Sequence, residues 1–159
     1  MGDAVHDLLD EHGVEYELHD HDRAVSANRL AEAEGVTGWD VAKPVLLSVG
    51  GELAMAVVPG PLHVDLDKAS DVLGHNEVRL ADEQEFTDRF PDAEPGAEAP
   101  FGNLYGIPVF LDEQLRARDR MVCRDGSHTR TISLTTFDFV ELVAPEIVDI
   151  AAAGTAPER

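Results

Sequence analysis

The sequence has few cysteines and lysines and no long apolar run. A single cysteine, Cys123, excludes an internal disulfide and leaves no partner thiol for a CxxC metal or redox motif. No stretch approaches the roughly 18 apolar residues of a membrane span. The opening residues 1–10 carry acids where a secretory signal needs basic residues followed by an apolar run. These absences predict a soluble, cytoplasmic protein.

Positive charge is scarce, because 12 Lys and Arg face 32 Asp and Glu, which gives a formal net charge of −20. The 43% of hydrophobic residues lie in periodic blocks, so the composition favours a folded core over disorder. We interpret the acidity as adaptation to a salt-rich cytoplasm, where the Debye length falls to about 3 Å at 1 M salt. An ordinary acidic protein is the alternative, and full stability in dilute buffer would favour it.

The length of 159 residues suits one domain with a single core, which we place at residues 1–150. Residues 151–159 are mostly small and are predicted to form a flexible tail outside the core. Helical spacing predicts a helix over 4–12, and strict alternation predicts a half-buried strand over 14–18. A further helix is expected over 26–34, with Ser26 as its cap.

The rest of the chain alternates between strand and helix patterns. Two apolar runs, 41–49 and 52–59, are joined by Gly50 and Gly51 and predict a buried hairpin. Helices are expected over 65–73, 82–90 and 136–143, a short helix or turn over 112–118, and strands over 77–80, 107–111, 121–124 and 131–134. The pattern predicts a mixed α/β fold.

Lys43 stands inside the first apolar run of the hairpin, between Ala42 and Pro44. Its ammonium group must either reach the surface on its stem or hold an anion or polar substrate in a cleft. In a chain with only two lysines, this position favours a functional role. Lys68, the other lysine, is predicted to be a solvated surface residue.

The stretch from residue 95 to 112 begins with Pro95, Gly96, Pro100 and Gly102, so it must be a shaped loop rather than a helix or ladder strand. Such a loop can hold bare backbone N–H groups in fixed directions and bind an oxyanion or ester carbonyl. The side chains between Gly96 and Pro100 should then matter less than the backbone path, so replacing Glu98 is expected to be mild. A plain surface connection is the alternative.

Three other kinds of site were weighed. His19 and His21 share a strand face and resemble a metal pair, but the spacing indicates no third ligand. Cys123 lies in an apolar strand and is interpreted as a core residue rather than a nucleophile. Ser127 and His128 are adjacent in sequence, which is not the Gly-x-Ser-x-Gly arrangement of a serine hydrolase.

Four segments together resemble the YbaK/EbsC family of aminoacyl-tRNA deacylases, a family also found as the editing insertion of bacterial prolyl-tRNA synthetases. They are Val41-Ala42-Lys43-Pro44, Val57-Val58-Pro59, the Pro95 to Gly106 stretch, and Gly126-Ser127-His128-Thr129. The similarity runs in order from the first expected helix to about Pro145. Its most specific part is the Gly-x-x-x-Pro loop followed by Phe-Gly.

The resemblance implies a fold and an activity. The expected fold is a mixed, partly closed β-sheet or barrel surrounded by helices. The expected reaction is trans-editing, the hydrolysis of the ester between a mischarged amino acid and the 3′ end of tRNA, with no metal and no cofactor. The expected partners are the acceptor end of an aminoacyl-tRNA and, as a second candidate, a synthetase; neither a membrane nor DNA is expected.

The resemblance also implies site residues. Lys43 falls on the family's functional lysine, and Gly96 to Pro100, with Phe101 and Gly102 after them, on the loop that holds the terminal adenosine and aminoacyl group. Gly126, Ser127 and His128 fall on the segment that closes the pocket. His21 lies where the family lines its pocket, in a stretch, 19–22, that is more acidic than usual, so the amino acid removed is left open.

Two other classes of function also stay open, a binding module of the same fold without turnover and a metal-dependent hydrolase that uses His19 and His21. The net charge opposes any tRNA partner, because nucleic-acid binding normally relies on basic patches. High salt would weaken that objection by screening the repulsion.

Overall fold

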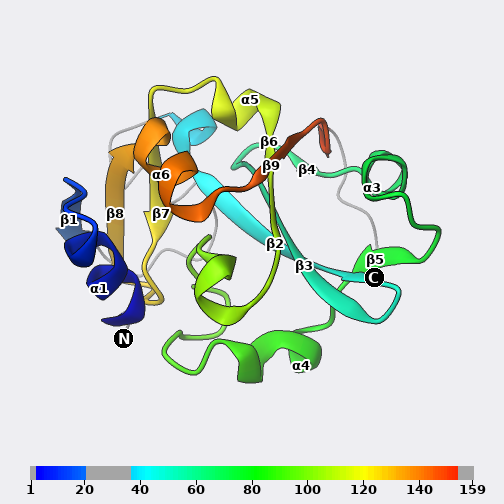
Figure 1. Cartoon of the computed structure of the whole chain (residues 1–159), viewed down its shortest axis with the longest axis horizontal. Helices are drawn as coiled ribbons and strands as arrows, with labels where there is room; N and C mark the ends of the chain where they lie inside the picture. Colours follow the sequence, from blue (N-terminus) through cyan, green and yellow to red (C-terminus); the bar gives the residue numbers. More distant parts are fainter. Residues whose placement is uncertain (1–2, 21–36, 154–159) are drawn as a thin grey trace.

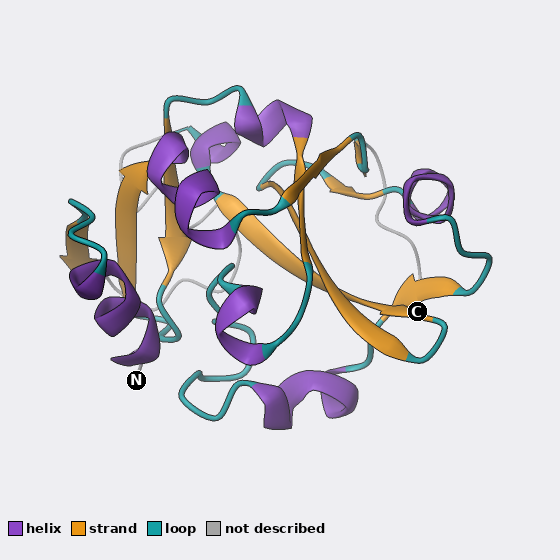
Figure 2. Ribbon diagram, viewed as in Figure 1, coloured by secondary structure: helices purple, strands orange, loops and turns teal. Residues whose placement is uncertain are grey.

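The computed structural model describes residues 3–20 and 37–153, which form three open β-sheets with helices around them (Figures 1 and 2). The helices are α1 (Asp3–Glu11), α3 (Leu66–Leu73), α4 (Glu83–Phe86), α5 (Glu113–Arg116) and α6 (Thr136–Val143), with the 3-10 turns η1 (Gly38–Asp40), η2 (Thr87–Arg89) and η3 (Gly102–Tyr105). The mixed α/β class is confirmed. The described strands do not form the partly closed barrel that we expected, because each of their sheets is open.

The largest sheet has five strands in the order β5-β2-β3-β6-β9. Their bounds are β5 (Val78–Leu80), β2 (Ala42–Val49), β3 (Glu52–Pro59), β6 (Val109–Asp112) and β9 (Glu146–Val148). Strands β2 and β3 pair antiparallel over their full length, as the expected hairpin requires. Gly50 and Gly51 turn the chain between them with φ of 59° and 92°, which glycine adopts without strain. Strand β6 then runs parallel to β3, and β9 runs parallel to β6.

Both faces of this sheet are covered by apolar side chains. Met55 and Val57 of β3 belong to one buried cluster, whereas Ala56 and Val58 belong to another. Successive residues of a strand point to opposite faces, so the two clusters lie on the two sides of the sheet. Burial on both faces explains why the hairpin reads as continuous apolar runs rather than as an alternation.

The second sheet has the order β1-β8-β7, and its strands are β1 (Glu17–Asp20), β8 (Arg130–Thr135) and β7 (Arg120–Arg124). The predicted half-buried strand over 14–18 is shifted, because Val14 and Tyr16 pack on the core before β1 begins. Leu18 on β1 is 50% exposed instead of buried. Strand β1 pairs only with β8 among the described strands, and at this sheet edge the alternation of sequence did not predict the buried side.

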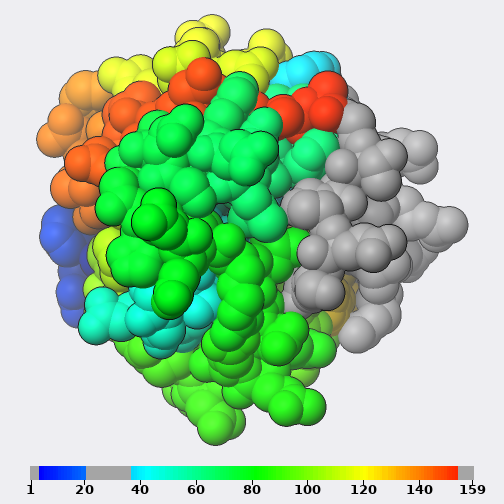
Figure 3. Space-filling model, turned by 90° about the vertical axis from the view of Figure 1, so that its right-hand side faces the viewer, coloured from blue at the N-terminus to red at the C-terminus, as the bar shows by residue number. Residues whose placement is uncertain are grey.

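A two-stranded sheet joins β4 (His63–Val64) to β10 (Ala151–Ala152). Ala151 is 1% exposed and belongs to the second apolar cluster, so the flexible tail that we expected does not begin at residue 151. The reason is a buried carboxylate: Asp112 Oδ1 accepts hydrogen bonds from the backbone N–H groups of Ile150 and Ala151, both at 3.0 Å. In Figure 3 the C-terminal strands, in red, lie beside the green segment that carries β4 and α3.

The helix ends follow the predicted capping. Asp65 accepts hydrogen bonds from two N–H groups in the first turn of α3, and Gly74 ends that helix with φ of 64°. Thr135 caps α6 by accepting from the N–H of Asp138 at 3.1 Å. The helix predicted over 26–34 lies outside the described residues. Among the helices that the structure describes, none has the length and apolar character to cross a membrane.

Candidate active site

Two loops that are distant in the sequence meet beside the second sheet. One is the glycine and proline loop, residues 94–100, and the other is the turn between β7 and β8, residues 125–129. The N–H of Glu94 donates to the carbonyl oxygen of Gly126 at 2.7 Å, and His128 Nε2 lies 2.7 Å from the carbonyl oxygen of Pro95. The structure therefore brings together the two segments that the sequence singled out.

Gly96 is the turning point of the first loop and is exposed, with φ of +83°. A Cβ atom at this position would lie 3.4 Å from His128 Cε1 and would also strain the backbone. Its N–H donates to Glu98 Oε2 at 2.8 Å, and the N–H of Ala97 donates to the carbonyl oxygen of Glu94 at 2.9 Å. These two amides are satisfied within the loop, so the expectation of bare amides does not hold for them.

Glu98 is a structural part of the loop rather than an incidental side chain. It is 9% exposed, and burial raises the pKa of its carboxyl group, although the N–H of Gly96 and its own N–H favour the anion. Nearby Glu83 also raises this pKa, and His128 lowers it. The side chain that fixes the path of Gly96 is thus Glu98, and the expectation that its loss would be mild needs revision.

The end of the loop turns into the core. Pro100 is buried, and Phe101 is 0% exposed with its ring 5.4 Å from that of Phe139. Gly102 is needed for close packing, since a Cβ atom there would lie 2.8 Å from the carbonyl oxygen of Ile107. Phe101 and Gly102 anchor the loop to the body of the domain, and of the expected loop residues Gly96 is the one on the surface.

Lys43 lies near the start of β2 on a half-buried stem. Its ammonium group donates to the carbonyl oxygens of Gly60, at 3.2 Å, and Leu62, both in the turn between β3 and β4. Burial lowers the pKa of this ammonium group. These hydrogen bonds hold a turn of the five-stranded sheet and do not connect Lys43 to residues 94–100 or 125–129.

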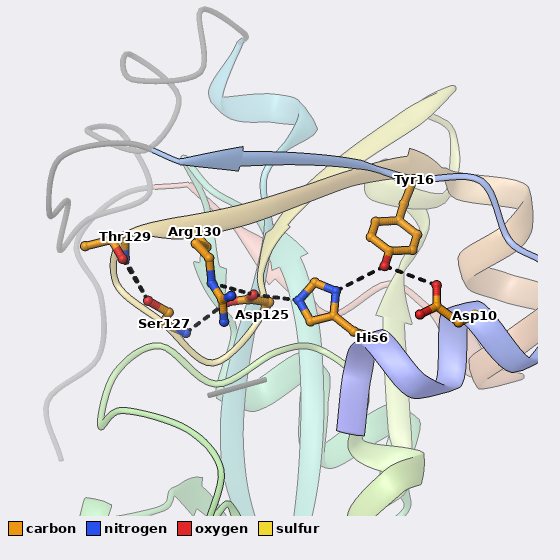
Figure 4. Close-up of polar contacts among 7 residues, drawn as sticks. All are labelled: His6, Asp10, Tyr16, Asp125, Ser127, Thr129 and Arg130. Carbon is orange, nitrogen blue, oxygen red and sulfur yellow. Dashed lines mark hydrogen bonds and ion pairs between the residues drawn. The ribbon is translucent and has the colours of Figure 1, made fainter. Parts of the chain in front are cut away.

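The turn after β7 is organised by Asp125, whose side chain is fully buried. Asp125 Oδ1 accepts from the N–H of Ser127 at 3.1 Å, and Oδ2 accepts from His6 Nε2 at 2.8 Å (Figure 4). Ser127 Oγ lies 3.0 Å from Thr129 Oγ1 rather than on His128. His128 is 4% exposed, and its Nδ1 has no hydrogen-bond partner among the described residues.

The other weighed positions are placed as follows. Cys123 is 1% exposed in the first apolar cluster, and burial raises the pKa of its thiol, which suits a core residue. His19 on β1 lies 3.4 Å from Glu17 Oε2. His21 lies outside the described residues. Within residues 3–20 and 37–153, no three His, Cys, Asp or Glu side chains come together as a metal site.

Sequence reasoning missed His6, Asp125 and the role of Glu98. Each acts through a contact with a distant residue or a loop backbone, and neither kind of contact leaves a periodic pattern. One signal was present: Asp125 precedes a glycine in a hairpin turn, where Asp side chains commonly accept from the N–H two residues on.

Comparisons with known proteins agree on one relationship. The sequence profile described as the aminoacyl-tRNA editing domain matches residues 21–142. The proline--tRNA ligase of Shouchella clausii (strain KSM-K16) is 29% identical over 100 residues, which are 63% of this chain and 17% of the ligase. The chain thus spans less than a fifth of that relative.

Solved structures share the fold. A candidate trans-editing enzyme for prolyl tRNA synthetase superposes with a TM-score of 0.84 at 19% identity, covering 96% of this chain and 97% of that one. The hypothetical protein APE2540 superposes with a TM-score of 0.85 at 18% identity, covering 94% of this chain and all (100%) of that one. At these identities the likeness concerns the fold alone. The profile match over most of the sequence shows the relationship: the chain belongs to the aminoacyl-tRNA editing domain family, of the YbaK type and related to the editing domain of prolyl-tRNA synthetase.

Proposed function

We propose that this chain removes wrongly attached amino acids from tRNA in trans, by hydrolysing the ester at the tRNA 3′ end. The observation that carries the proposal is the family match together with the contact between residues 94–100 and 125–129. An aminoacyl ester needs little activation, so a positioned water and oriented polar groups supply the required catalysis. No protein nucleophile takes part in this scheme.

In the proposed site the exposed edge at Gly96 receives the terminal adenosine and the aminoacyl group. Gly126, Ser127 and His128 line the other side, with Pro100, Phe101 and Gly102 holding the loop in place. The attacking water is oriented by the ribose hydroxyl of the substrate and by the loop backbone. Lys43 acts as the cation for the negative end of the substrate, and His21 belongs to the pocket lining.

The partner in this proposal is the acceptor end of an aminoacyl-tRNA, which places the protein in the cytoplasm. A synthetase is the second candidate partner. With a net charge of −20, tRNA binding cannot rest on a broad basic surface, so recognition is confined to the acceptor end. Salt screening reduces the repulsion of the rest of the tRNA.

A binding module without turnover is the second candidate, and one observation favours it. The N–H groups of Gly96 and Ala97 are already bonded inside the loop, so they do not point free at an oxyanion. Such a loop still fits an adenosine or an amino acid. Binding of mischarged tRNA without faster ester hydrolysis would support this candidate.

The test is a panel of tRNAs, each charged with a noncognate amino acid, incubated with the purified chain in molar potassium chloride. We expect faster loss of the aminoacyl group from at least one mischarged tRNA than in protein-free samples. The same assay with excess chelator separates the metal-dependent alternative, since the proposed reaction keeps its rate there. Equal rates with and without protein for every tRNA would overturn the proposal.

A further inference from the structure

Helix α1 reaches the turn after β7 through one line of hydrogen-bonded side chains (Figure 4). His6 Nε2 carries a proton and donates it to Asp125 Oδ2 at 2.8 Å, because a carboxylate only accepts. On the other side of the ring, His6 Nδ1 lies 3.2 Å from the hydroxyl of Tyr16. That hydroxyl donates to Asp10 Oδ1 at 3.2 Å. The line therefore connects the surface of α1 to the carboxylate beneath residues 126–128.

Asp125 passes this contact directly to the backbone of the site. Its Oδ1 accepts from the N–H of Ser127, and its Oδ2 also lies 3.2 Å from Arg130 Nε. A buried carboxylate keeps a fixed orientation only when its donors come from defined directions. His6 supplies the one donor that comes from outside the β7–β8 hairpin, so it ties the orientation of Asp125 to the position of α1.

The docking of α1 does not depend on His6. Val5 and Leu9 are 1% and 0% exposed, and both pack in the first apolar cluster. The side chain of His6 is 18% exposed and lies at the rim of this contact. Removing its imidazole should therefore leave the helix in place and release the turn, which separates positioning from folding.

We propose that His6 is a positioning residue of the editing site, which through Asp125 fixes the N–H of Ser127 and the backbone that carries His128. This inference rests on the proposed function, because the turn matters for catalysis only if substrate lies against it. Loss of His6 frees Asp125 to rotate, and the 126–128 backbone then samples other positions. Positioning of this kind acts on the reacting ester more than on binding of the tRNA body, so it lowers kcat more than it raises KM.

The experiment compares His6→Ala, His6→Gln and the wild type by deacylation kinetics, by melting temperature and by hydrogen exchange at the Ser127 amide. A glutamine amide can keep a donor to Asp125, so His6→Gln is the conservative replacement. His12→Ala is the matched control, because His12 is an exposed histidine just after the same helix, bonded to the carbonyl oxygen of Leu8 at 3.0 Å.

We expect His6→Ala to lower kcat by about tenfold with little change in KM, and to speed exchange at Ser127. We expect His6→Gln to recover most of both, and His12→Ala to match the wild type. Wild-type kcat and wild-type exchange at Ser127 in folded His6→Ala would overturn the inference, as would a failure of His6→Gln to recover either. If the wild type itself does not deacylate any tRNA, the proposed function fails, whereas unchanged exchange at Ser127 separately refutes the link from His6 to the turn.

Discussion

At the scale of single residues, Lys43 has two tasks, because its ammonium group satisfies two carbonyl oxygens and supplies the proposed cation. Lys43→Ala should lower deacylation by at least about tenfold. It should also lower the free energy of unfolding by about 1 to 3 kcal/mol, since the carbonyl oxygens lose their donor. This second effect revises the expectation from sequence, in which a partly exposed lysine could be removed without cost to the fold.

Lys43→Arg separates the two tasks. Arginine keeps donors for the turn but moves the charge and changes its shape, so we expect near-normal melting with reduced deacylation. Lys68→Ala is the control for loss of a lysine, because Lys68 pairs with exposed Asp149 at 2.9 Å and should contribute little to stability. Wild-type rates in Lys43→Ala would exclude Lys43 from the reaction.

Glu98 gives a pH dependence whose sign can be worked out. Burial raises its pKa in the folded protein above the ordinary 4.5, so the unfolded chain loses this proton first as pH rises. The folded state is therefore penalised progressively from about pH 4.5 upward, through the folded pKa, and the full penalty is present at neutral pH. Glu98→Gln removes the charge and keeps an acceptor for the N–H of Gly96.

The prediction is that Glu98→Gln melts higher than the wild type at pH 7, by about 2 to 4 °C for each kcal/mol gained, and that the difference shrinks toward pH 4. Glu98→Ala, which leaves the N–H of Gly96 without its acceptor, should melt lower than Glu98→Gln at both pH values. Thermal melts across this range provide the measurement. A gap between Glu98→Gln and the wild type that widens at acid pH would show that the sign is wrong.

At the scale of elements, the loop around Gly96 is expected to control turnover. Gly96→Val introduces a β-branched side chain at φ of +83° and places its Cβ 3.4 Å from His128 Cε1. We expect a severe loss of deacylation. Backbone strain of this kind costs about 1 to 3 kcal/mol, so the melting temperature should fall moderately rather than collapse.

Gly51→Val is the matched control, because Gly51 has φ of +92° in the β2–β3 turn and its added Cβ would meet no atom within 4 Å. It carries a similar backbone strain at another place, so it should melt like Gly96→Val and keep wild-type rates. Equal activity losses in the two variants would mean that general destabilisation, and not the loop, explains the effect.

Asp112 decides whether the C-terminal strand stays attached. Three backbone N–H groups donate to this buried carboxylate, from Gln114, Ile150 and Ala151, each at 3.0 Å. Asp112→Ala should cost about 1 to 3 kcal/mol for each orphaned group that stays buried. Denaturant unfolding measures this, and Asp149→Ala, at an exposed position of the same segment, should cost less than about 1 kcal/mol. Similar losses in both variants would refute the role of Asp112.

Most of the longer elements could be predicted, because each has its own signal. The α1 and α6 helices follow apolar spacing and capping, and the β2–β3 hairpin follows two apolar runs around a double glycine. Strands β4, β9 and β10 could not be predicted, since they have two or three residues and exist through pairing partners distant in sequence. Residues 151 and 152 were assigned to a tail because the carboxylate that holds them is 39 positions away.

The candidate site was predictable in its segments and not in its contacts. The glycine and proline pattern located the loop, and the Gly126 to His128 segment was identified by resemblance. Which groups bond within the loop depends on where Glu98 and His128 come to lie after folding. The hydrogen bonds of Lys43 to a sheet turn could not be deduced either, because sequence position alone does not say which carbonyl oxygens are left without a donor.

At the scale of the whole molecule, the net charge of −20 governs stability in dilute solution. Attractive pairs such as Arg79 with Glu85 and Arg118 with Asp40 are weakened by salt, but acids outnumber bases 32 to 12, so repulsion dominates. We therefore expect the melting temperature to rise as potassium chloride increases toward 1 M, where the Debye length is about 3 Å. A melting temperature that is already maximal in dilute buffer would contradict adaptation to salt.

The central claim is that this chain hydrolyses the ester of a mischarged aminoacyl-tRNA without help from a synthetase. The most direct measurement follows the fraction of tRNA that stays aminoacylated, in molar potassium chloride, with wild-type chain, with Gly96→Val and without protein. The account predicts a rapid decline with the wild type, and curves for Gly96→Val close to the protein-free sample. Identical curves in all three samples, for every amino acid and tRNA tried, would contradict it.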